Sequence, residues 1–189
     1  MNRKNFLKTI SGGTLALTLA PNLVFAERCR VLNQNSEYKL TILHTNDQHS
    51  RIEPFDASDG RNANKGGFAR RATLIQQIRN QAKNVLLLDS GDIFQGTPYF
   101  NFYGGELEFK LMSMMGYDAS TMGNHDFGNG LEGFLKVLPN AKFPFITSNY
   151  DFSNTILDGK TEKYKIFNKD GIKVGIFAVG IELDGLVGK

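Results

Sequence analysis

Three short polar segments carry side chains that could bind metal ions and act on a substrate. They are Asp47-Gln48-His49, Gly91-Asp92 and Gly123-Asn124-His125-Asp126. The first places a carboxylate and an imidazole two residues apart, the second adds a carboxylate, and the third adds an amide oxygen, an imidazole and a carboxylate. Divalent cations accept oxygen and imidazole ligands, and histidine also transfers protons. Together the segments predict a metal centre with catalytic side chains.

Each segment has an ordinary structural explanation when it is taken alone. Aspartate and histidine are common in loops, and aspartate after glycine is typical of a turn at the end of a strand. Asparagine and aspartate also cap helices, and a helix is expected from Leu131. The occurrence of all three segments in order, each after an apolar run, favours the metal centre.

Apolar runs of strand length precede the three segments, at residues 38–43, 85–88 and 119–122. An amphipathic helix from about Gly66 to Ala82 and a second helix at 106–115 lie between these runs. Alternating strands and helices predict an α/β fold, in which the carboxyl ends of parallel strands meet at one edge of the sheet. The polar segments should therefore lie close together.

The rest of the chain extends the same pattern. Residues 51–65 are rich in turn-forming residues and predict a surface loop. A third helix is expected at 131–138 and a fourth strand at 145–148. Residues 164–167 and 173–179 predict a hairpin around Asn168-Lys169-Asp170-Gly171.

The charge distribution disfavours a nucleic-acid-binding protein. The formal net charge is +3, but Arg3, Lys4 and Lys8 lie in the first 26 residues without an acidic residue among them. Removal of that segment leaves equal numbers of basic and acidic residues. The remaining chain has no run of basic residues interleaved with aromatic ones. No nucleic-acid partner is expected.

Residues 1–26 have the composition of a secretory signal peptide. A basic start precedes an apolar stretch and the small-residue end Val24-Phe25-Ala26, and the stretch is shorter than a membrane-spanning helix. Export to the periplasm or cell surface is expected, with no membrane span after removal of the signal. Arg3-Lys4 resembles a twin-arginine signal with one arginine replaced. Residues 27–37 then form a polar linker, in which the single Cys29 cannot close an internal disulfide.

The three segments resemble the signature of the calcineurin-like metallophosphoesterases. Residues 43–47, 89–96 and 115–118, together with Gly123-Asn124-His125-Asp126-Phe127, resemble more narrowly the bacterial 5'-nucleotidases. The likeness extends from about Leu40 to the end of the chain. It implies a layered α/β/β/α sandwich, incomplete here, that hydrolyses phosphate monoesters of nucleotides.

The same resemblance implies two divalent metal ions, zinc, manganese or similar, which activate a water for attack on phosphorus. Asp47 and His49 would hold one ion, Asp92 would bridge both, and Asn124 would bind the second.

The resemblance also implies the catalytic pair. His125, oriented by Asp126, would stabilise the charge that develops on the phosphate.

The chain departs from the family pattern after this signature. Members of the family supply further histidines from later Gly-His and Gly-His-x-His segments, whereas the three histidines here are His44, His49 and His125. The second metal site is therefore expected to be incomplete, and residues 38–189 to be the N-terminal portion of the catalytic domain. The nucleotide-binding C-terminal domain is expected to be absent. These features predict weak metal binding, little turnover and an unpaired sheet edge.

Alternative functions remain open at this point. An inactive remnant, a UDP-sugar hydrolase or a 2',3'-cyclic phosphodiesterase would share the same N-terminal sequence segments.

His44 ends an apolar strand and is assigned a structural role. Five aromatic residues could form a base-stacking platform, but core packing or a domain contact is favoured; they are Phe94, Tyr99, Phe100, Phe102 and Tyr103.

Overall fold

The structure is a computed structural model that describes residues 37–187. The expected signal peptide (1–26) and residues 27–36 of the expected linker lie outside the described residues. Within residues 37–187, no helix combines the length and the apolar character needed to cross a membrane.

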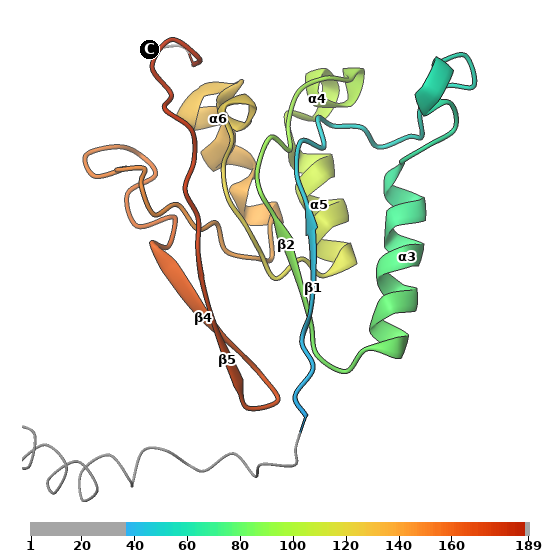
Figure 1. Cartoon of the computed structure of the whole chain (residues 1–189). Helices are drawn as coiled ribbons and strands as arrows, with labels where there is room; N and C mark the ends of the chain where they lie inside the picture. The colour runs from blue at the N-terminus through green and yellow to red at the C-terminus, as the bar shows by residue number, and fades with distance from the viewer. Residues whose placement is uncertain (1–36, 188–189) are drawn as a thin grey trace, which may run out of the picture. The chain divides into compact units, whose positions relative to one another are not determined.

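A three-stranded parallel sheet forms the centre of the fold (Figure 1). Its strands are β1 (Thr41–Thr45), β2 (Val85–Asp89) and β3 (Ala119–Ser120), in the order β1-β2-β3. The apolar Val-Leu-Leu-Leu run of β2 is buried almost throughout, as is typical of a central strand covered on both faces. The parallel pairing confirms the predicted α/β class.

Two helices lie together against one side of this sheet: α3 (Phe68–Gln81) and α5 (Glu106–Met115) (Figure 1). Helix α3 is the predicted amphipathic helix, and it buries Phe68 and Ile75. Helix α5 ends at Gly116, which adopts φ 72° and donates its backbone N–H to the carbonyls of the last turn. Glycine takes this left-handed conformation without a steric penalty, so it ends the helix.

The remaining helical elements are short. They are η1 (Gly60–Asn62), α4 (Pro98–Tyr103), η2 (Asn124–Phe127), α6 (Gly130–Val137) and η3 (Leu138–Asn140). The expected helix at 131–138 corresponds to α6, which begins and ends one residue earlier. Helix α4 was not predicted, although the sequence marks both of its ends, because proline favours the first helical position and glycine the position after the last.

Three strand predictions need correction. The strand expected at 119–122 is shortened to β3 (Ala119–Ser120). The first strand begins and ends later than the predicted 38–43, so that His44 lies within β1 with an exposed side chain. The expected strand at 145–148 is reduced to two isolated bridges, Ser120 to Phe145 and Ile146 to Glu162. The segment changes its partner from one residue to the next, so no regular ladder forms.

The predicted hairpin is confirmed as β4 (Tyr164–Lys169) paired with β5 (Ile172–Phe177). Its two-residue turn uses Asp170 and Gly171 at φ 55° and 88°, the positive values that a tight hairpin requires. One face of the hairpin presents apolar side chains to solvent: Tyr164, Ile166 and Phe177. Among the described residues β1 pairs with β2 alone, so its other edge is open.

An aromatic cluster forms the core between the helices and the sheet. Phe109 is fully buried, and its ring centroid lies 4.9 Å from that of Phe94 and 5.3 Å from that of Phe145. Phe94 and Phe100 are buried, as predicted for core residues. Two other residues of the aromatic group do not belong to the core, because only one side of the short α4 packs inward: Phe102 and Tyr103 are exposed, and a domain contact through them stays a prediction.

Truncation of Phe109 tests the energetic weight of this cluster. Phe109→Ala removes a buried ring and leaves a cavity, so we expect the free energy of unfolding to fall by about 3–5 kcal/mol. Urea unfolding measures the change. Phe102→Ala removes the same side chain from an 82% exposed position and should change this free energy by less than about 0.5 kcal/mol. Equal losses in the two variants would contradict the assignment of the core.

Candidate metal centre

Side chains from the loops after all three parallel strands meet at one place. His49, Asp92 and His125 each offer a ligand atom, and these atoms lie within 4.8 Å of one another. The two imidazole rings meet edge to face, with their centroids 4.8 Å apart. The order β1-β2-β3 puts the three loops at the same edge of the sheet, which is why residues far apart in sequence come together.

Backbone hydrogen bonds join the first two loops. The N–H of Asp47 donates to the Gly91 carbonyl at 3.0 Å, and the N–H of His49 donates to the Asp92 carbonyl at 3.0 Å. The third loop is attached through a side chain, because the N–H of His125 donates to Asp92 Oδ1 at 2.9 Å. Asp92 therefore contacts both neighbouring loops.

The loops approach so closely that glycine is required at the contacts. A Cβ atom at Gly123 would lie 2.2 Å from Asp92 Oδ1, and a Cβ atom at Gly91 would lie 2.4 Å from the Gly123 nitrogen. Both separations are far below van der Waals contact. The glycines that precede Asp92 and Asn124 in the sequence thus create the space for the site.

Strained backbone directs the side chains of the site. Asp47, His49 and Asp92 have φ values of 50°, 46° and 55°, in the left-handed region that residues with side chains rarely adopt. Such conformations persist only where the surrounding structure holds them, and they are concentrated at functional sites.

Asp47 lies at the border of the group. Its Oδ1 is 3.8 Å from His49 Nε2, and its side chain is 57% exposed. The neighbouring Asn46 amide donates to its other carboxylate oxygen. Asn124 opens η2 directly before His125 and is half-buried. The structure therefore places all four predicted metal ligands on the three loops and brings His49 and Asp92 together with His125.

Asp126 has partners different from the one expected. Its buried carboxylate accepts backbone N–H groups from Asp92 at 2.9 Å, Ile93 at 2.8 Å, Phe94 at 3.1 Å and Gly123 at 2.8 Å. Burial raises the pKa of Asp126 to about 7, although these N–H donors act in the opposite direction.

The expected pairing between Asp126 and the His125 ring is therefore corrected. Consecutive residues of a 3₁₀ turn point in directions about 120° apart, so the two side chains diverge. The partner of the ring is Gln95, whose Oε1 lies 2.8 Å from His125 Nδ1. Sequence reasoning missed Gln95, although the residue lies within one of the segments that carry the family resemblance.

A buried polar network supports the first two loops from below. Asp89 accepts hydrogen bonds from Thr45 Oγ1 at 2.6 Å, Gln48 Nε2 at 2.6 Å and Ser120 Oγ at 3.1 Å. Burial raises the pKa of Asp89, and the hydrogen bonds oppose this rise. The Arg71 guanidinium donates to the Gln48 side-chain carbonyl. Gln48 is thereby held between α3 and β2, and the flanking Asp47 and His49 remain at the surface of the sheet edge.

The grouped donors fit a divalent cation. Two imidazoles and one carboxylate within 4.8 Å of one another are the ligand types that zinc and manganese accept. Exposed Asp47 and half-buried Asn124 supply oxygen atoms on the same loops. The chain thus possesses a donor set for one cation and candidate ligands for another.

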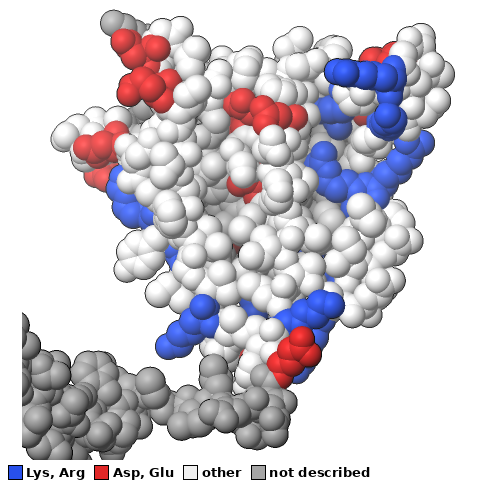
Figure 2. Space-filling model, in the orientation of Figure 1, with Lys and Arg blue, Asp and Glu red and all other residues white. Residues whose placement is uncertain are grey.

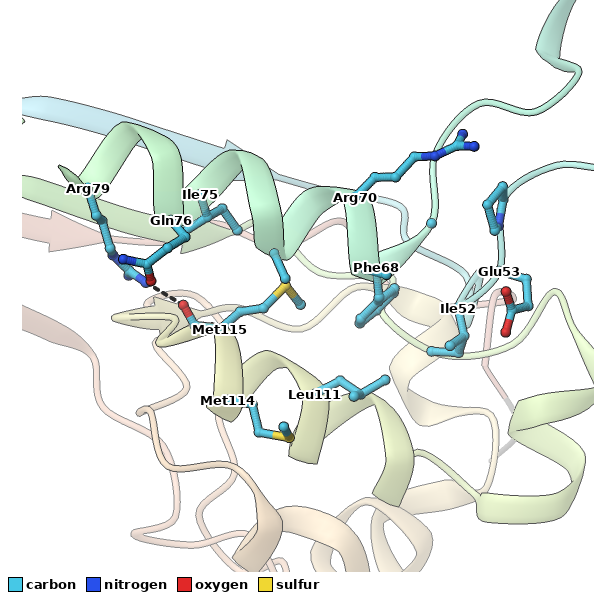
Figure 3. A pocket seen from close by; sticks show the side chains of 14 residues that line it. Ile52, Glu53, Phe68, Arg70, Ile75, Gln76, Arg79, Leu111, Met114 and Met115 are labelled. Carbon is cyan, nitrogen blue, oxygen red and sulfur yellow. Dashed lines mark hydrogen bonds between the residues drawn. The ribbon is translucent and has the colours of Figure 1, made fainter. Parts of the chain in front are cut away.

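A separate cavity of about 550 Å³ lies between α3 and α5 (Figure 3). Its walls are mainly apolar and include Phe68, Ile75 and Leu111. Arg79 at one end donates to the carbonyls of Met115 and Gly116, so its charge is already engaged with the chain. None of the grouped donors lines this cavity.

The surface charge is mixed on the face shown in Figure 2. Lysine and arginine side chains occur there in separate places, interspersed with aspartate and glutamate. The expectation that the chain binds no nucleic acid stays a prediction.

Comparison with known proteins relates most of the chain to one family. The profile of the calcineurin-like phosphoesterase family matches residues 40–183. The chain is 46% identical over 146 residues to snake venom 5'-nucleotidase from Naja atra, covering 74% of this chain and 28% of that protein. It is 41% identical over 156 residues to 5'-nucleotidase from Homo sapiens, covering 80% of this chain and 26% of that protein.

Solved structures give the same result. The 5'-nucleotidase precursor from Thermus thermophilus superposes with a TM-score of 0.70 at 37% identity, covering 76% of this chain and 29% of that one. The NAD nucleotidase of Haemophilus influenzae superposes with a TM-score of 0.68 at 35% identity, covering 75% of this chain and 26% of that one. The chain spans about a quarter of the length of these relatives. The match over most of its residues shows that the chain belongs to the calcineurin-like phosphoesterase family.

Proposed function

We propose that this chain carries one side of a site that hydrolyses phosphate monoesters of nucleotides with the help of two divalent cations. The observation that supports the proposal most directly is the convergence of His49, Asp92 and His125 from three separate loops. Several similar proteins are named 5'-nucleotidases, and these names support nucleotides as the substrates of this chain.

The residues of the chain would divide the work as follows. His49 and Asp47 would hold one cation, Asp92 would contact both, and Asn124 would hold the other. Bound cations supply a water of lowered pKa and neutralise phosphate charge. His125 would face the phosphate and donate a hydrogen bond or proton as negative charge develops there.

The role proposed for Asp126 is to hold the loops. Its carboxylate fixes the backbone N–H groups of Asp92 and Gly123, one on each side of the site. Because these residues adjoin the ligands, a fixed backbone keeps the donor atoms within reach of one cation before any cation binds.

The cellular location and the number of metal ions remain predictions. Export rests on the composition of residues 1–26. Weak binding at the second metal position rests on the small number of histidines, three in the whole chain.

Asp92→Asn tests the metal site. Asparagine keeps an acceptor for the His125 N–H and tolerates a positive φ, but it removes the negative charge. We expect the Kd for Mn²⁺, measured by isothermal titration calorimetry, to rise about 10-fold or more, because changes behind a ligand already cost 10–100-fold. Asp56→Asn removes an equal charge from the exposed loop at 51–65 and should leave the Kd unchanged. A Kd insensitive to Asp92→Asn would refute the site.

Phosphate release from AMP tests the reaction. With Mn²⁺ present, we expect slow release of inorganic phosphate that EDTA abolishes. We expect His125→Ala to lower the rate about 100-fold or more, because proton transfer by a positioned side chain contributes about 10²–10⁴-fold. His44→Ala removes an exposed imidazole on β1 and should leave the rate unchanged. Release that persists in EDTA, or that both variants lower equally, would count against the proposal.

A further inference from the structure

Within residues 37–187, the His125 ring forms a hydrogen bond with the side chain of Gln95. The distance from Gln95 Oε1 to His125 Nδ1 is 2.8 Å, that of a good hydrogen bond. A glutamine oxygen can only accept, so Nδ1 must carry the proton in this arrangement. The only other ring nitrogen, Nε2, then keeps its lone pair when the ring is neutral.

Gly128 provides the space that Gln95 occupies. Its backbone has φ −58° and ψ −27°, an ordinary right-handed conformation that any residue adopts, so the backbone does not require glycine. A Cβ atom at this position would lie 2.0 Å from Gln95 Nε2. Any larger residue at position 128 would therefore displace the Gln95 amide from the His125 ring.

The backbone on both sides of this contact is fixed. Gln95 has φ 65°, a strained value that the surrounding structure must maintain. Directly before it, the N–H groups of Ile93 and Phe94 donate to the Asp126 carboxylate at 2.8 Å and 3.1 Å. Asp126 also belongs to the turn that carries His125. One carboxylate thus sets the distance between the loop of Gln95 and the turn of His125.

We propose that Gln95 is the positioning residue for His125: its side-chain carbonyl accepts the Nδ1 proton and fixes the ring, so that Nε2 can bind a cation or, when the ring carries a second proton, donate to the phosphate. The role of Nε2 in catalysis rests on the proposed function, whereas the position of the proton on Nδ1 of His125 does not. An amide carbonyl has no net charge, so Gln95 selects the tautomer and orientation of the ring without the attraction that a carboxylate would exert on the imidazolium form.

The tautomer can be read directly by NMR. Uniformly ¹⁵N-labelled chain is studied free of metal, in EDTA, at an alkaline pH of about 9, so that the neutral ring is observed. The chain contains three histidines, so the ring signals are assigned with His44→Ala and His49→Ala. Two-bond and three-bond ¹H–¹⁵N correlations identify the protonated nitrogen. We expect the proton of His125 on Nδ1.

Three variants distinguish loss of the Gln95–His125 hydrogen bond from a nonspecific disturbance of the fold. Gln95→Asn keeps an amide and tolerates the positive φ, but it is one methylene too short to reach the ring, so we expect the proton to move to Nε2 as the major form. Gly128→Ala should have the same effect by displacing the Gln95 amide. Gln95→Glu keeps an acceptor and should retain the proton on Nδ1.

Gly175→Ala is the matched control, because nothing lies within 4 Å of the added Cβ atom and its φ is not positive. It should leave the His125 spectrum unchanged, and backbone ¹H–¹⁵N spectra verify that each variant is folded. A wild-type proton on Nε2, or a proton that stays on Nδ1 in both Gln95→Asn and Gly128→Ala, would overturn the proposal. Because metal and substrate are absent, failure of AMP hydrolysis would leave this result standing.

Discussion

The buried carboxylate of Asp126 fixes the geometry on which the site depends. It accepts four backbone N–H groups, three from the loop after β2 and one from the loop after β3. A carboxylate shielded from water is costly unless its oxygens are fully hydrogen-bonded, and unpaired N–H groups would be costly as well. Both costs are removed only when the loops after β2 and β3 lie at the particular distance that lets Asp126 accept all four N–H groups. That separation sets the distance between Asp92 and His125.

Strain and close approach accompany this arrangement. Asp47, His49, Asp92 and Gln95 all adopt positive φ, which costs on the order of 1 kcal/mol for each residue. The stabilising free energy that offsets this cost comes from beneath the loops. The aromatic cluster around Phe109 and the buried β2 provide it. Several of the local conformations that disfavour folding thus lie at the edge of the sheet that carries the proposed site.

The sequence was sufficient to predict the parallel strands, the two principal helices and the three loops that converge, because periodicity and strand-end polar residues are local signals. It was insufficient for contacts that depend on side-chain direction. Asp126 and Gln95 are both polar neighbours of the site in sequence, and only the η2 turn decides which of them meets the His125 ring. Gln48 was overlooked for the same reason, since its burial follows from its partners Asp89 and Arg71.

Hydrogen bonds within the protein orient the site. His125 is held by Gln95 through its ring and by Asp92 through its backbone, while the loop of His49 is joined to Asp92 by a backbone hydrogen bond. A site assembled in this way loses little conformational entropy when a cation binds, so more of the ligand interaction appears as affinity. The contact with Gln95 engages one nitrogen of the His125 ring and leaves the other available, so this neutral partner would matter to the proposed site as much as the expected metal ligands.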